Sequence, residues 1–186
     1  MNKVPVYLNS GTVVAESGSV RIYNYNDKLY MENKPGVLIS YDDKRKDYIW
    51  QLSDRPFGRV LVLGLGLGLS AKYIFSLPRV RDLVVMEEDS DVIKTTSMVQ
   101  PHLEFYTIVK VDNYLEAIYK DNSIYDFIFL DCYNKIDNAT LPIIADLINA
   151  CKKKLSSYSR SALVGWLPES TPEILIETFF DLFSLK

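Results

Sequence analysis

The sequence has few residues of the kinds that build disulfide frameworks, metal sites or membrane spans. Its 186 residues include two cysteines, Cys132 and Cys151, and one histidine, His102. Two cysteines and one histidine are too few for a disulfide framework, and they argue against a zinc site or a Ser-His-Asp triad. We therefore predict no bound metal. No apolar run approaches the ~18 residues of a membrane span, and the first residues lack a signal-peptide core. We therefore expect a soluble, cytoplasmic protein without a membrane partner.

Positive charge is also scarce. The chain has 21 lysines and arginines against 24 aspartates and glutamates, a net charge of −3, and its basic clusters at 44–46 and 152–154 are short. Binding to a nucleic-acid backbone needs a basic face, so we predict no nucleic-acid partner. With 48% hydrophobic residues, the chain is long enough for one proper core and too short for two full domains.

The most informative stretch runs from Val60 to Ser70, where an apolar run leads into alternating glycines and then into a helical pattern. It predicts a buried strand, a tight turn and a helix. Gly64, Gly66 and Gly68 lack a Cβ, so a ligand could approach the backbone and meet the first amides of the helix. The pattern alone fits a nucleotide site and a turn made for packing equally well.

From residue 59 onward, apolar runs of strand length alternate with helical patterns, which is typical of a parallel sheet flanked by helices. We therefore predict a Rossmann-like α/β fold, with Ser90 as the N-cap of the second helix. The predicted strands cover 60–63, 82–87, 105–111, 125–130 and 162–166. The predicted helices cover 69–77, 115–119 and 140–155, one more begins at 90, and a final one starts within 170–173.

The residues before this region predict a small β-rich arm. Alternating residues 19–25, the dipeptide Asn26-Asp27 and residues 29–31 predict a hairpin. Pro35-Gly36 predicts a further turn, and residues 43–52 predict a helix. We thus expect an arm and linking helix over 1–55, followed by the Rossmann-like domain over 56–186.

Acidic or amide residues stand at the ends of three predicted strands: Glu87, the pair Asp112-Asn113, and Asp131. Carboxyl ends of parallel strands meet at one edge of the sheet, where ligands bind. Glu87 lies 23 positions after Gly64, near the ~20 at which an acid contacts ribose hydroxyls in dinucleotide-binding folds. We expect these side chains to surround a nucleoside ligand.

Four strings, "VLVLGLGLG", "VVMEEDSDVIK", "VKVDNYLEAI" and "YDFIFLDCYN", occur in an order and spacing that resemble the class I S-adenosylmethionine-dependent methyltransferase fold. Within that fold the chain resembles the spermidine synthase-like (polyamine aminopropyltransferase-like) branch, over roughly residues 20–167. The resemblance implies S-adenosylmethionine or its decarboxylated form as co-substrate. It further implies that the glycines would lie close to the methionine part of the ligand and that Glu87 would bind its ribose. Asp112 and Asn113 would contact its adenine.

By the same resemblance Asp131 would help deprotonate an attacking amine. If the chain is a transferase, we expect Asp131 and Tyr133 to lie beside the reacting sulfonium. Leu67 and Asn134 stand where spermidine synthases carry acidic residues, which argues against polyamine synthesis. The sequence ends at Lys186, before the family's final antiparallel hairpin. An exposed fifth strand would follow, so we predict that a homodimer contact or the β-rich arm covers it.

Three functions fit these patterns. The first is a transferase that moves a methyl or aminopropyl group to a small-molecule acceptor. The second is a binding or structural module that has the fold without the chemistry. The third is an NAD-dependent oxidoreductase, although its loop more often separates the last two glycines by two residues and Asp112 would be unexplained. Cys132 fits packing better than nucleophilic catalysis, and His102 fits a surface position.

Overall fold

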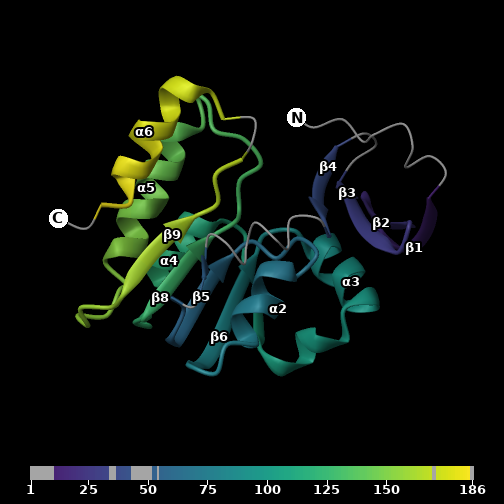
Figure 1. Ribbon diagram of the computed structural model, residues 1–186, viewed down its shortest axis with the longest axis horizontal. Helices are drawn as coiled ribbons and strands as arrows, with labels where there is room; N and C mark the ends of the chain where they lie inside the picture. Colours follow the sequence, from purple (N-terminus) through teal and green to yellow (C-terminus); the bar gives the residue numbers. More distant parts are fainter. Residues whose placement is uncertain (1–10, 34–36, 43–51, 54, 169–170, 185–186) are drawn as a thin grey trace.

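The computed structural model describes residues 11–33, 37–42, 52–53, 55–168 and 171–184, which form two sheets (Figure 1). The N-terminal sheet is antiparallel, with strand order β1-β2-β3-β4. The larger sheet is parallel, with strand order β7-β6-β5-β8-β9. The strands of the first sheet are β1 Thr12–Ser17, β2 Val20–Tyr25, β3 Lys28–Asn33 and β4 Leu38–Tyr41. Those of the second are β5 Gly58–Leu63, β6 Val80–Glu87, β7 Thr107–Lys110, β8 Phe127–Leu130 and β9 Ala162–Gly165.

The predicted hairpin is confirmed as β2 and β3. Asn26 and Asp27 have φ angles of 51° and 60°, as a two-residue turn with both central residues at positive φ requires. The predicted turn at Pro35-Gly36 lies outside the described residues, apart from its flanks. So does nearly all of the helix predicted over 43–52.

The parallel sheet confirms the predicted α/β fold. From β5 the chain adds β6 and β7 on one side and then crosses to add β8 and β9 on the other. The strand order therefore reverses at β5 and β8, and ligands bind open sheets outside the carboxyl ends of strands at such a point.

Helices cover both faces of the parallel sheet. Because strand side chains alternate between the faces, Val60 and Val62 belong to a core beneath α2, whereas Leu61 and Leu63 face α4 and α5. Helix α6 packs beside α5 (Figure 1). The helices are α2 Leu69–Phe75, α3 Ser90–Val99, α4 Tyr114–Lys120, α5 Leu141–Lys152 and α6 Glu173–Leu182, with a 3-10 helix at Pro101–Phe105. No helix in the described ranges is both long and apolar enough to cross a membrane.

The N-terminal sheet packs against α3 (Figure 1). The Ser17 hydroxyl donates a hydrogen bond to Asp91 at 3.0 Å, and the Asn33 amide donates one to Asp89 at 3.1 Å. Asp89 is also the N-cap of α3, since its carboxylate accepts a bond from the Asp91 backbone N–H at 2.8 Å. The prediction of Ser90 as the cap was therefore wrong by one residue.

Strand β9 is one edge of the parallel sheet, and α3 lies at the opposite side of the sheet, next to β6. The described part of the N-terminal arm therefore does not cover β9 (Figure 1). A homodimer contact at this edge stays a prediction. His102, predicted at the surface, is half-buried in the 3-10 helix.

Candidate functional site

A cavity of about 120 Å³ lies at the carboxyl edge of the parallel sheet, where the two sheets meet. It brings together four residues that the sequence predicted for the site, namely Gly64, Gly66, Glu87 and Asp131. The N-terminal sheet contributes to its wall as well. The remaining lining residues are Asn33, Ile39, Asp89, Val92, Tyr114, Cys132 and Asn134.

Glu87 is the buried acid among the residues that line this cavity. Its side chain is held by two backbone amides, because Leu65 N–H donates to Oε2 and Asp89 N–H donates to Oε1, each at 2.8 Å. The residue is 7% exposed. Burial raises the pKa of Glu87 above its ordinary value, and the two amide hydrogen bonds oppose that shift. The carboxylate is thus fixed in orientation, with each oxygen accepting one described bond.

The glycine loop approaches the other walls so closely that side chains would not fit. Gly64 has φ of 96°, and a Cβ there would collide with the backbone carbonyl of Asp131. Gly66 has φ of 50°, and its Cβ would lie 3.2 Å from the hydroxyl oxygen of Ser40, on β4 of the N-terminal sheet. At Gly64 the positive φ and the clash with backbone both require glycine, and at Gly66 the positive φ favours it.

Asp131 and Cys132 follow directly after β8. The Asp131 backbone N–H donates to the Leu63 carbonyl at 2.8 Å, which holds the end of β8 against the start of the glycine loop. Both residues are half-buried. Burial raises the pKa of the Cys132 thiol well above its ordinary value, so the thiolate is disfavoured. This geometry favours a packing role for Cys132.

Four predicted site residues do not line the cavity in the described structure. The Asp112 carboxylate is fully exposed and pairs with Lys110 at 3.1 Å. The Asn113 side chain caps α4 by accepting a bond from Glu116 N–H at 3.0 Å. The Tyr133 ring packs on Phe179, with ring centroids 6.0 Å apart, and Gly68 is the N-cap of α2.

Tyr114 is a lining residue that the sequence analysis missed. It is the first residue of α4, directly after Asp112-Asn113, and its backbone N–H donates to the Glu88 carboxylate at 2.7 Å. Its hydroxyl accepts a bond from Glu88 N–H at 3.3 Å. Burial raises the pKa of Tyr114 far above its ordinary value, so the phenol stays protonated. Its position one residue past the predicted pair was the available signal.

Asn33 and Ile39 were missed for another reason. They belong to β3 and to β4 of the N-terminal sheet, far from the glycine loop in sequence. No local pattern in the sequence places that sheet beside the loop. Among the described residues no group of three or more histidine, cysteine or carboxylate side chains could hold a metal ion.

Comparison with known proteins places this geometry in a fold. No protein-family model and no curated protein matches the sequence. Among solved structures, the spermidine synthase of Thermotoga maritima aligns with 77% of the chain at a TM-score of 0.60 and 18% identity. The chain has the spermidine synthase fold. A spermidine synthase in complex with the transition state analogue AdoDATO aligns over the same share, at a TM-score of 0.62 and 18% identity.

The chain aligns with only part of each known spermidine synthase structure. The chain covers 53% and 55% of those two proteins, so it spans about half of their length. The precorrin 8w decarboxylase of Methanobacterium thermoautotrophicum aligns with 75% of the chain and 67% of its own length, at a TM-score of 0.50 and 20% identity. At such identities the likeness establishes the fold, and activity has to be argued from the site.

Proposed function

We propose that the chain binds S-adenosylmethionine or decarboxylated S-adenosylmethionine at the carboxyl edge and transfers a methyl or aminopropyl group to a small acceptor. The observation that carries the proposal is the placement of Glu87, which faces the glycine loop at the strand-order reversal. The fold shared with spermidine synthases is consistent with this proposal.

The Glu87 carboxylate suits a ribose. An ionised carboxylate has about four acceptor positions. Two of them take the amides of Leu65 and Asp89, which leaves two for a pair of adjacent hydroxyls. Gly64 and Gly66 leave the backbone open beside it, because neither has a Cβ.

The volume of the cavity decides how much of a ligand it takes. At about 120 Å³ it is smaller than the roughly 300–1,000 Å³ of sites that enclose a drug-sized ligand. It therefore accommodates a sugar-sized part of an adenosyl ligand, and the rest would lie along the edge. Tyr114 offers an aromatic ring in its wall for the base.

The charge of the edge suits a cation. Glu87, Asp89 and Asp131 all line the cavity, and no lysine or arginine lines it among the described residues. Carboxylates attract positively charged groups such as a sulfonium or an amine. A bound sulfonium would supply an electrophilic carbon, and Asp131 would orient an amine acceptor and take up its proton. The hydroxyl of Tyr133 lies beside Gly165 and the residue does not line this cavity, so we assign it no part here.

One observation favours the second candidate, a binding module without turnover. Leu67, at the position where spermidine synthases carry an aspartate, is 0% exposed and packs in the core beneath α2. A hydrophobic side chain there gives no ligand contact. This candidate predicts ligand or partner binding with no group transfer.

Calorimetric titration of the purified protein tests the proposal. The ligands are S-adenosylmethionine, decarboxylated S-adenosylmethionine, methylthioadenosine and NAD, with the variants Glu87→Ala and, as control, Glu116→Ala. Glu116 is an exposed glutamate that pairs with Lys120 on α4. We expect micromolar binding of an adenosyl-sulfur ligand, weakened about tenfold or more by Glu87→Ala because charge-assisted hydrogen bonds to the ribose are lost, and unchanged by Glu116→Ala.

The other outcomes are distinct. Preferential binding of NAD would support the oxidoreductase instead. Absence of binding to all four ligands would contradict the proposal and leave the module without a nucleoside ligand. Equal affinity of the wild type and Glu87→Ala would remove Glu87 from the site.

A further inference from the structure

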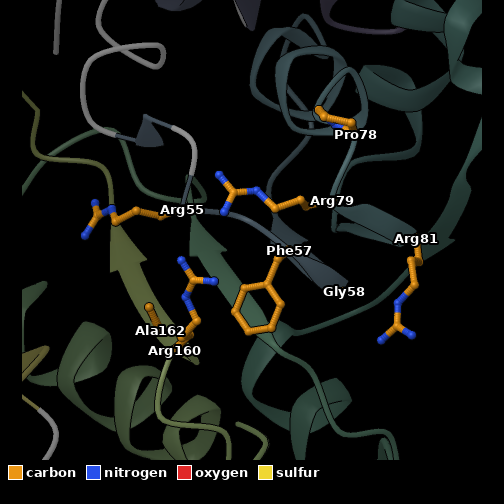
Figure 2. Close-up of a pocket in the computed structure, with 8 residues that line it drawn as sticks. All are labelled: Arg55, Phe57, Gly58, Pro78, Arg79, Arg81, Arg160 and Ala162. Carbon is orange, nitrogen blue, oxygen red and sulfur yellow. The ribbon is translucent and has the colours of Figure 1, made fainter.

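A second, larger cavity lies at the amino edge of the parallel sheet. It has a volume of about 560 Å³, and the side chains around it include four arginines, Arg55, Arg79, Arg81 and Arg160 (Figure 2). Arg55 precedes β5, Arg79 and Arg81 stand at the start of β6, and Arg160 precedes β9. Because the strands are parallel, their amino ends meet at this edge, which gathers arginines from three parts of the chain.

The composition of this arginine cavity is selective. The chain has seven arginines, and four of them line it. Of the described residues lining it, none is a lysine and none carries a carboxylate. Arginine presents a planar fork of donors that matches phosphate oxygens two at a time, whereas lysine acts as a point charge. The cavity therefore has the chemistry of a phosphate site.

Two of the described carboxylates lie near the arginine cavity, and both have partners. Asp126 accepts bonds from Arg59 N–H at 2.9 Å and from the Ser156 hydroxyl at 2.8 Å, and it lies 3.8 Å from Arg81. Asp82 pairs with Arg59 at 3.0 Å. Asp126 is 7% exposed and the side chain of Arg81 is 79% exposed, so the carboxylate is below the surface and the guanidinium is above it.

An aromatic ring lies among the arginines. Phe57, half-buried before the start of β5, lies between the side chains of Arg160 and Arg81 in Figure 2. Pro78 and Ala162 add apolar surface to the same cavity. A base or similar ring can stack on such a phenyl face while its phosphates meet the guanidinium groups.

We propose that the arginine cavity binds a small phosphorylated ligand of the nucleoside polyphosphate class. Its volume of about 560 Å³ falls within the roughly 300–1,000 Å³ of small-molecule sites. Its side chains supply several positive charges and one aromatic face, which together match a multiply charged phosphate group joined to a ring. A simple metal ion or an uncharged ligand would meet no such match.

This site is separate from the cavity at the carboxyl edge. The six residues of β5 rise about 3.3 Å each, so the two edges lie about 20 Å apart. The proposal does not depend on the proposed function, because none of the residues lining one cavity lines the other in the described structure.

The test is calorimetric titration of the full chain with ATP and with inorganic tripolyphosphate at physiological salt. The variants are Arg79→Gln/Arg160→Gln, Phe57→Leu and, as control, Arg21→Gln. Arg21 is an arginine of the N-terminal sheet that pairs with Glu16 at 2.7 Å. We expect the double variant to weaken both ligands by about tenfold or more, and Phe57→Leu to weaken ATP but not tripolyphosphate. Arg21→Gln should change neither.

Several outcomes would overturn the proposal. One is absence of ATP binding at millimolar concentration, and another is equal binding by the wild type and the double variant when both have the same melting temperature. Much tighter binding of a single strand of about ten nucleotides, lost in the double variant, would assign the cavity to nucleic acid instead. Tripolyphosphate has no ribose for Glu87 to hold, so its binding tests the arginine cavity alone, and failure here and failure at the carboxyl edge are distinguishable.

Discussion

The two edges of one sheet differ in sign of charge and in how they are built. The carboxyl edge has a glycine loop and three carboxylates, Glu87, Asp89 and Asp131, around a small cavity. The amino edge has four arginines and Phe57 around a cavity with more than four times that volume. The first is fixed by backbone contacts such as that between Gly64 and Asp131, whereas the second is formed mainly by long, exposed side chains.

This difference shows why a net charge describes a protein poorly. A value of −3 argues against a basic face, and the short basic runs of the sequence support that argument. The four arginines of the amino edge come from three separate parts of the chain, so no basic run in the sequence indicates them. Parallel strands nevertheless begin at the same edge and bring them together, as they bring the strand-end acids together at the other edge.

The largest expected effect is on turnover, and it comes from a substitution at the carboxyl edge that leaves the amino edge unchanged. Asp131→Asn should leave adenosyl-ligand affinity nearly unchanged and lower turnover by about 10²–10⁴-fold, because general-base catalysis is lost. The measurement is release of the thioether product in the presence of a panel of small amines. Unchanged turnover would contradict a catalytic role for Asp131, and ATP binding at the amino edge serves as the control.

Replacing one glycine at each edge by alanine compares how much stability each edge loses when a Cβ is added. Gly64→Ala should lower the free energy of unfolding by about 3 kcal/mol, because its Cβ meets a backbone carbonyl at positive φ. Gly58→Ala should cost about 1–2 kcal/mol, because its φ is 65° and its Cβ meets the side chain of Asp126, which can shift. Urea denaturation measures both, and equal losses would contradict the difference in construction.

The smallest expected effect is the change in adenosyl-ligand affinity with pH. Burial raises the pKa of Glu87, with the charge of Asp89 adding to the shift, so the folded protein holds this proton more tightly than the unfolded chain. As pH falls through the raised pKa, the stability cost of burying the carboxylate disappears and the ribose acceptor is lost. Adenosyl-ligand affinity should therefore fall on acidification, beginning above the pH at which an exposed glutamate titrates.

The control for this titration is Glu87→Gln, whose amide does not ionise and whose affinity should vary less with pH. A wild-type affinity that is constant down to pH 4 would show that Glu87 does not take part in binding.

Local patterns predicted most of the fold correctly. The apolar run 60–63 and the glycines after it predicted β5 and the loop. A strand buried on both faces needs consecutive apolar residues, and a turn with positive φ favours glycine, so both features can be recognised from neighbouring residues. The strand-end position of Glu87 likewise predicted a lining residue. The cap of α3 was predicted one residue late, because Asp89 and Ser90 are both good caps and the choice depends on the exact end of β6.

Side-chain direction was harder to predict than position. Asp112 and Tyr133 follow strands as expected, yet one faces solvent beside Lys110 and the other packs on Phe179. The position of a residue at the end of a parallel strand predicts the edge of the sheet at which it lies. Where its side chain points depends on packing against helices that come later in the sequence.

The sequence by itself determined the strands and helices of the parallel sheet, the glycine loop and the acids at the carboxyl edge, because each depends on residues within a few positions of one another. The tertiary structure alone decided that the N-terminal sheet closes the small cavity through Asn33 and Ile39. It also decided that four separated arginines surround one larger cavity. Both arrangements depend on which strands lie side by side, and that order is set by burial of the whole core rather than by any local pattern.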